Sequence, residues 1–263
     1  SFAMLAAALS LRAACSKQDD PPLARAVAML FCMLTKPPQI AFAFLEGMTG
    51  SLGGLRRRWP ISLAVVAPGI ALTLLWFWIG GAQMGEWRIV LGTKLPAEHF
   101  SIGWKLRFML AEPLHFPSLV LATLAKEWLT LWRQLIGVLG WLDVPLAAWV
   151  YPALSAALAL VAFEHLELDA RSRLRAALSC LAAVLAYALI VFAIFFIKWT
   201  PVDAVEVWGM QGRYFLVMLP ALAIAVSALA NRAAPPRLVR LAAILGALVS
   251  GIASFEAIWR VNW

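Results

Sequence analysis

Lys36 is the first residue of this sequence whose type and setting could do chemistry. It lies between apolar runs, in the segment Leu-Thr-Lys-Pro-Pro. A charged side chain at membrane depth costs about 2.5–3.5 kcal/mol on insertion scales, so such a residue is a functional candidate by default. Its ammonium group could pair with the phosphate of a polyprenyl or other lipid. The alternative is a lysine that reaches the membrane surface or caps helix carbonyls.

A second group of polar residues stands just before a long apolar run. The segment Trp-Gly-Met-Gln-Gly-Arg-Tyr-Phe contains Gln211, Arg213 and Tyr214. An arginine fork beside the start of a helix is a good anion site, although arginine and tyrosine are also common membrane anchors. If Lys36 and Arg213 hold one phosphate, we expect both to face the same outer cavity.

No catalytic residue can be assigned from the remaining polar residues. The carboxylates expected outside the membrane are widely spaced: Glu86, Glu98, Glu112, Glu127, Asp143, Asp203 and Glu206. We interpret Asp143 and Asp203 as caps or ion-pair partners. The three histidines are isolated and the three cysteines form no Cys-x-x-Cys pair, so we expect neither a metal nor a cofactor. The sequence contains no Walker A, Gly-x-Ser-x-Gly, His-Glu-x-x-His or Gly-x-Gly-x-x-Gly motif.

The composition places these residues in a membrane protein. The 263 residues are 63% hydrophobic and only 14% charged, and the mean hydropathy is +0.84. Soluble domains are typically about 45–50% apolar and about 25% charged. The formal charge of +8 comes from short basic clusters between apolar runs. This placement indicates that the basic residues set the orientation of the protein in the membrane and do not bind nucleic acid. We therefore predict an all-α, polytopic transmembrane bundle that forms a single domain over residues 1–263.

Five apolar runs are long enough to cross a bilayer, and an apolar opening segment adds a part-crossing. The five are Pro60–Ala82, Leu146–Phe163, Ala177–Trp199, Tyr214–Ala230 and Leu241–Trp259. Three arginine clusters flank them. Arg56, Arg57 and Arg58 precede the first of the five; Arg171, Arg173 and Arg175 lie between the second and third; and Arg232, Arg237 and Arg240 lie between the last two. If the spans alternate, all three clusters share one side, which the positive-inside rule makes cytoplasmic. Residues 83–145 and 200–213 then lie outside. Because the chain opens on an apolar run without a basic start, we expect it to be the C-terminal part of a longer protein.

The segment Arg25–Leu55 must return to the side on which it starts if both its basic flanks are cytoplasmic. Pro37 and Pro38 interrupt it, and prolines remove backbone donors and break helices. We predict a hairpin of two short helices, Arg25–Leu34 and Gln39–Met48, with Lys36 at the outer tip. The alternative is one proline-kinked span.

The outer segment 83–145 contains a helix that we expect to lie in the membrane interface. Leu114–Ile136 is long and apolar but carries Lys126, Glu127 and Arg133 close together. A spanning helix here would also reverse the arginine clusters relative to each other. Trp128 and Trp132 suit the headgroup level.

Three of these motifs together resemble one protein family. Leu-Thr-Lys-Pro-Pro, Gly-Val-Leu-Gly-Trp-Leu-Asp and Met-Gln-Gly-Arg-Tyr-Phe-Leu-Val-Met-Leu-Pro occur in this order. They resemble the domain of unknown function 2142 family of bacterial membrane proteins. The chain departs from the family pattern at Met210, where valine is usual, and at Val217, where proline is usual. The family's hydropathy plan is similar to that of GT-C-type membrane glycosyltransferases.

This resemblance implies a bacterial inner-membrane protein that uses a polyprenyl-phosphate-linked sugar to build a cell-surface glycan. Lys36, Gln211, Arg213 and Tyr214 would then contact the lipid phosphate or the sugar. The catalytic base of GT-C enzymes lies in the first outer loop, which we expect to precede this sequence in the longer protein. The alternative is a transporter or flippase of a lipid-linked intermediate, but the chain shows only one broken helix and no repeat.

Overall fold

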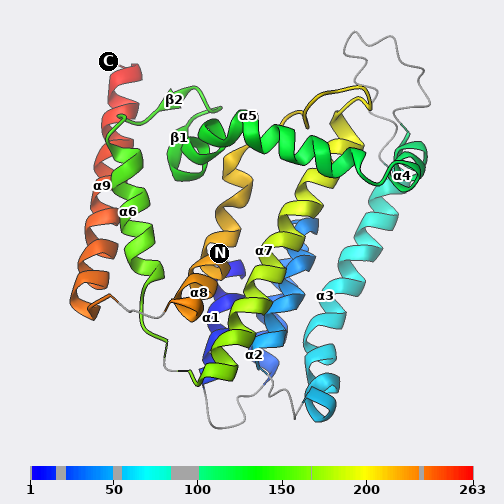
Figure 1. Ribbon diagram of the computed structural model, residues 1–263, viewed down its shortest axis with the longest axis horizontal. Coiled ribbons are helices and arrows are strands. Elements are labelled where there is room, and N and C mark those ends of the chain that lie inside the picture. Colours follow the sequence, from blue (N-terminus) through cyan, green and yellow to red (C-terminus); the bar gives the residue numbers. More distant parts are fainter. Residues whose placement is uncertain are drawn as a thin grey trace.

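The computed structural model describes residues 2–15, 22–49, 55–83, 101–166, 168–230 and 234–262, and these residues are mostly helical (Figure 1). The N-terminal half contains α1 (Phe2–Cys15), α2 (Pro22–Thr35), the 3₁₀ helix η1 (Pro37–Thr49) and α3 (Leu55–Gln83). The outer segment contains α4 (Ile102–Ala111), α5 (His115–Gly137) and the two-residue strands β1 (Val138–Leu139) and β2 (Val144–Pro145). The C-terminal half contains α6 (Val150–Ala162), α7 (Ala170–Trp199), the 3₁₀ helix η3 (Gly212–Met218), α8 (Leu219–Leu229) and α9 (Pro236–Asn262).

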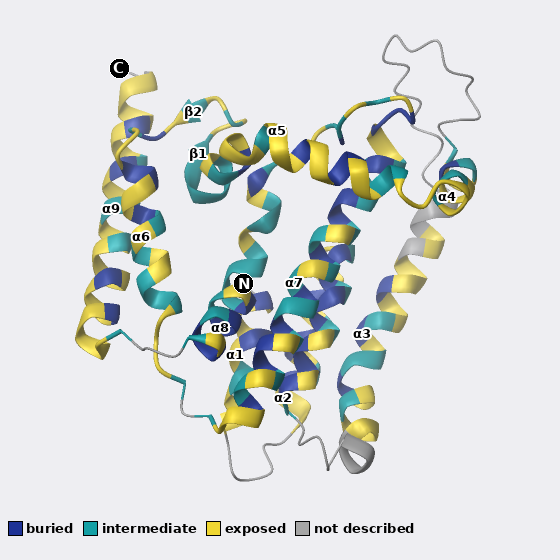
Figure 2. Ribbon diagram, in the orientation of Figure 1, coloured by how far each residue is buried: buried dark blue, intermediate teal, exposed yellow. Residues whose placement is uncertain are grey.

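The main core forms around α7, which packs against η1 and α8. The buried face of α7 contains Ala176, Ala177, Cys180 and Ala183. Small side chains let helix backbones approach closely, which is how helices associate when lipid competes for apolar surface. Figure 2 shows the complementary pattern, with exposed residues on the outward faces of α3, α7 and α9. Many of these exposed residues are large and apolar, as expected for faces that contact lipid.

Among the residues that the structure describes, four helical stretches are long and apolar enough to cross a membrane. They are Trp59–Trp76, Ala170–Trp199, Gly212–Leu229 and Pro236–Val261. They correspond to four of the five predicted spans. The fifth prediction, Leu146–Phe163, was too long, because α6 has only 13 residues. At 1.5 Å per residue it extends about 20 Å, short of the roughly 30 Å hydrocarbon core. Its predicted first residues, 146–149, form an irregular segment and a turn after β2, and α6 packs along α9.

The predicted hairpin at Pro37 and Pro38 is confirmed. Arg25 Nε lies 3.1 Å from Glu46 Oε1, whereas one continuous helix would separate these residues by about 30 Å. The proline-kinked span is therefore excluded. Both helices of the hairpin, α2 and η1, extend beyond the predicted residue limits, and η1 is a 3₁₀ helix.

The outer segment is bent sharply between its two helices. The axes of α4 and α5 differ by 96°. Figure 1 shows α5 lying across the ends of the upright helices, as predicted for Leu114–Ile136. A helix in this position covers the bundle end where Lys36 and η3 lie.

The arginine-rich segments share one end of the bundle. Helices α3, α7 and α9 all begin at the lower end in Figure 1 and finish at the upper end. One cluster residue also holds the fold together, since Arg173 donates hydrogen bonds to the carbonyls of Ala228 and Ala230 at the end of α8. The side chains of residues 56–58 and 232 lie outside the described residues. That this end is cytoplasmic stays a prediction.

Candidate lipid-phosphate site

Lys36 is held at the tip of the hairpin by bonds on both sides of it. Its carbonyl accepts a hydrogen bond from Gln39 N at 2.9 Å, which closes the turn over the two prolines. The Thr35 hydroxyl donates to Gln39 Oε1 at 2.7 Å and ties the end of α2 to the start of η1. The backbone of the tip is thus fixed while the Lys36 side chain remains exposed.

The structure brings Lys36 to Tyr214, which is 178 residues later in the sequence. Lys36 Nζ lies 5.7 Å from the centroid of the Tyr214 ring, within the range of a cation–π interaction. Tyr214 is itself positioned from α7. The Tyr187 hydroxyl donates to the Tyr214 carbonyl at 2.9 Å, and the Phe195 ring lies 5.2 Å from the Tyr214 ring. Two of the four predicted site residues are therefore in direct contact.

The other two predicted residues, Gln211 and Arg213, contact each other. Arg213 Nε donates to Gln211 Oε1 at 2.8 Å, and the arginine is exposed. This bond uses only one of the guanidinium's three nitrogens. The two terminal nitrogens of Arg213 can still donate to an anion.

Gly212 lets this segment lie directly against α5. A Cβ atom at Gly212 would stand 1.8 Å from the Leu131 carbonyl oxygen, so no other residue fits without a backbone shift. The Gly212 N–H donates to Gln134 Oε1 at 2.7 Å. Sequence reasoning missed Gln134, because nothing in a helix marks which glutamine will face a distant backbone amide.

The loop that leads into the site is attached to α5 by polar contacts. Lys126 Nζ lies 2.9 and 2.8 Å from the two carboxylate oxygens of Glu206, and this partner raises the pKa of Lys126. The Val207 N–H donates to the Thr123 hydroxyl at 2.8 Å. The sequence suggested no partner for Lys126 or Thr123. These contacts hold residues 200–211 on the helix that covers the site.

Lys105 performs a structural role that the sequence analysis also missed. Its buried Nζ donates to the carbonyls of Phe196 and Thr200, at 2.8 and 2.5 Å, where α7 ends. A cation at a helix C-terminus interacts favourably with the helix dipole. Removal from water lowers the pKa of Lys105 to about 8. Lys105 thereby joins α4 to the end of α7.

One comparison with known proteins decides the family. The sequence model described as predicted membrane protein (DUF2142) matches residues 1–222. The chain belongs to the DUF2142 family. The match includes the hairpin tip and all of η3. No curated protein and no solved structure matches the sequence.

The Gly-x-x-Gly-Trp-Leu-Asp motif of this DUF2142 protein contains the end of α5, strand β1 and the turn that leads to β2. Gly140 has a φ of +64°, a conformation that side chains other than glycine's rarely allow. Asp143 Oδ1 accepts from Trp141 N at 3.0 Å, so Asp143 caps a turn. In the parts of the chain that the structure describes, no three His, Cys, Asp or Glu side chains gather as a metal site would require.

Proposed function

We propose that this DUF2142 protein is a membrane transferase that binds a polyprenyl-phosphate-linked sugar at the tip of its hairpin. The sugar would pass to a cell-surface glycan on the side opposite the arginine clusters, with the protein in the bacterial inner membrane. The observation that carries the proposal is the meeting of Lys36 with Tyr214, beside Arg213. The similarity of the family's hydropathy plan to GT-C glycosyltransferases supports the same conclusion.

An anionic ligand follows from the charges at the tip. Lys36 and Arg213 are exposed cations on neighbouring segments, and in the described part of the chain neither forms an ion pair with a carboxylate. A phosphate between two cations relieves their repulsion and accepts several charge-assisted hydrogen bonds. Because Gln211 holds the guanidinium through Nε, its terminal nitrogens are oriented before a ligand arrives.

The roles of the two cations differ. Arg213 presents a planar fork that grips two phosphate oxygens, while Lys36 supplies a point charge. The site would hold the carrier phosphate and orient the sugar toward an acceptor hydroxyl. A carboxylate outside this site would take the acceptor proton.

Binding of a polyprenyl phosphate to purified protein tests the proposal. We expect Lys36→Ala and Arg213→Ala each to weaken binding about tenfold, the loss of one charge-assisted hydrogen bond. Arg213→Lys should impair binding more than Lys36→Arg. The matched controls are Lys198→Ala and Arg107→Ala, which remove exposed cations elsewhere. Wild-type binding by the double alanine variant would overturn the proposed site.

A second assay separates transfer from transport. Protein in liposomes is supplied with a lipid-linked radiolabelled sugar and an envelope glycan extract. We expect label to appear in the glycan, and to be lost in the double variant. Movement of intact lipid-linked sugar between leaflets without transfer would contradict the transferase and favour a flippase.

A further inference from the structure

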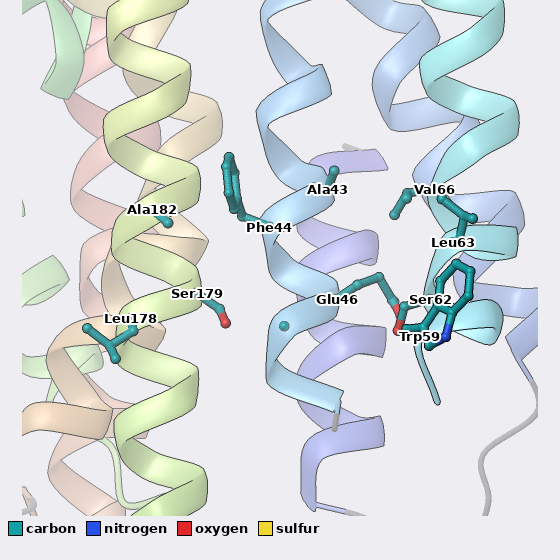
Figure 3. A pocket seen from close by; sticks show the side chains of 11 residues that line it. Ala43, Phe44, Glu46, Trp59, Ser62, Leu63, Val66, Leu178, Ser179 and Ala182 are labelled. Atoms are coloured by element: carbon teal, nitrogen blue, oxygen red, sulfur yellow. The ribbon is translucent and has the colours of Figure 1, made fainter. Parts of the chain in front are cut away.

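A cavity lies near the arginine-rich end of the bundle, far from Lys36. It has a volume of about 510 Å³ and opens between η1, α3 and α7 (Figure 3). Ligand sites typically occupy about 300–1,000 Å³. Glu46 lines it, ten residues beyond Lys36, which corresponds to roughly 15–20 Å along a helix. The cavity is therefore separate from the lipid-phosphate site.

Glu46 brings a buried carboxylate to this cavity. The residue is 4% exposed, and its Oε1 accepts from Arg25 Nε. Its other oxygen, Oε2, is buried, and no donor among the described residues meets it with good hydrogen-bond geometry, although the Ser62 hydroxyl lies close to the carboxylate. An acceptor that is removed from water and left unsatisfied costs about 1–3 kcal/mol, so a donor from a ligand would be bound favourably there. Figure 3 shows the Glu46 side chain reaching from η1 toward Ser62 and Trp59 on α3.

The cavity wall changes from polar to apolar in the same direction on each helix. On α3, Ser62 lies below Val66, and on α7, Ser179 lies below Ala182 (Figure 3). On η1, Glu46 lies at the same level as the two serines. The lower part can thus accept hydrogen bonds, whereas the upper part offers only apolar contact. This polarity matches a molecule with a polar head and an apolar chain.

The cavity is open to the surroundings of the bundle through exposed apolar residues. Phe44, Trp59 and Leu178 all line it and are 52%, 57% and 57% exposed. On membrane helices such exposed apolar surface faces lipid, and tryptophan is typical of the headgroup level. An occupant can therefore enter from the bilayer with its head beside Trp59.

We propose that this cavity binds one membrane lipid with a primary ammonium headgroup. The ammonium donates a charge-assisted hydrogen bond to Glu46 Oε2, and an acyl chain lies against Val66 and Ala182. The aromatic face of Trp59 suits a cation as well. A choline headgroup has the same charge but no N–H donor, and a glycerol headgroup has donors but no positive charge.

The test uses protein released from nanodiscs that contain equal amounts of phosphatidylethanolamine, phosphatidylcholine and phosphatidylglycerol with identical acyl chains. Native mass spectrometry then counts the lipid that each molecule retains. We expect wild-type protein to retain phosphatidylethanolamine about tenfold over phosphatidylcholine. Glu46→Gln should reduce this preference to near unity. Equal retention of phosphatidylcholine or phosphatidylglycerol by the wild type, or no retained lipid, would overturn the proposal.

Because Glu46→Gln leaves Arg25 buried without its partner, a second variant avoids the ion pair. Ala182→Phe fills the apolar part of the cavity and should also abolish the retained lipid. Leu189→Phe is the matched control, since Leu189 is exposed on α7 about 10 Å beyond Ala182 and does not line the cavity. Wild-type retention in the Ala182→Phe protein would contradict the site even if Glu46→Gln does not fold.

Discussion

Replacing Gly212 with alanine tests how the candidate site is positioned. Gly212 is the point at which η3 meets the backbone of α5, directly before Arg213 and Tyr214. The new Cβ would lie 1.8 Å from the Leu131 oxygen, whereas Cβ atoms essentially never approach closer than 3.0 Å. The two segments must therefore separate by about 1.2 Å. Neither side of this contact is a flexible side chain, so the backbone itself has to move.

The structure allows an estimate of the cost. Overpacking that shifts a backbone costs about 1–3 kcal/mol. The same movement breaks the 2.7 Å hydrogen bond from Gly212 N to Gln134, which contributes about 0.5–1.5 kcal/mol. We expect Gly212→Ala to lower the free energy of unfolding by about 2–4 kcal/mol, which corresponds to a melting temperature about 5–15 °C lower. Because Arg213 and Tyr214 move with the backbone, affinity for polyprenyl phosphate should also fall.

Thermal unfolding of purified protein in detergent measures the first effect, and ligand binding below the transition measures the second. Gly251→Ala is the matched control, because a Cβ there meets nothing within 4 Å in the middle of α9. That control should be stabilised by about 0.5–1 kcal/mol through a better helix propensity. If the Gly212→Ala and Gly251→Ala proteins unfold at the same temperature, the result would contradict the close contact between η3 and α5.

Three further predictions concern the outer segment and the topology. Lys105→Met should destabilise the protein by about 2–4 kcal/mol through loss of two charge-assisted hydrogen bonds. Since the folded pKa of Lys105 is lowered to about 8 from 10.5, the unfolded chain binds more protons between these values. Wild-type stability should therefore rise from pH 8 to pH 10.5 relative to Lys105→Met, and parallel pH profiles of the two would argue against this role. Thr123→Val should speed hydrogen exchange at the Val207 amide, which loses its acceptor, and unchanged exchange would contradict the contact. Single cysteines at Arg173 and Glu206 should be labelled from opposite sides of the membrane, and labelling of both from one side would disprove the topology.

Composition and hydropathy were enough to predict the class of the fold. Helices and long apolar runs follow from local sequence, because a bilayer requires each helix to satisfy its own backbone groups. The hairpin was predictable for a similar reason. Two prolines remove backbone donors locally, and the basic flanks require the chain to return. The length of α6 was not predictable in this way, since residues 146–149 of the same apolar run form an irregular segment and a turn instead of helix.

The residues of the candidate site were predictable from the sequence, but their contacts were not. Lys36, Gln211, Arg213 and Tyr214 were identified from residue type and proximity to apolar runs, which are properties of the sequence. That Lys36 lies over Tyr214 could not be deduced, because the contact depends on how the hairpin and η3 pack on α7.

Contacts between distant segments were decided by tertiary structure alone. Gln134, Lys105 and Glu46 are ordinary polar residues in the sequence, and only packing shows that each faces a particular backbone group, cavity or buried cation. The hydropathy pattern specifies which face of a helix avoids water. It does not specify which neighbour meets that face, since many pairings of apolar helices bury similar area, and the choice among them rests on close contacts such as that of Gly212 with Leu131.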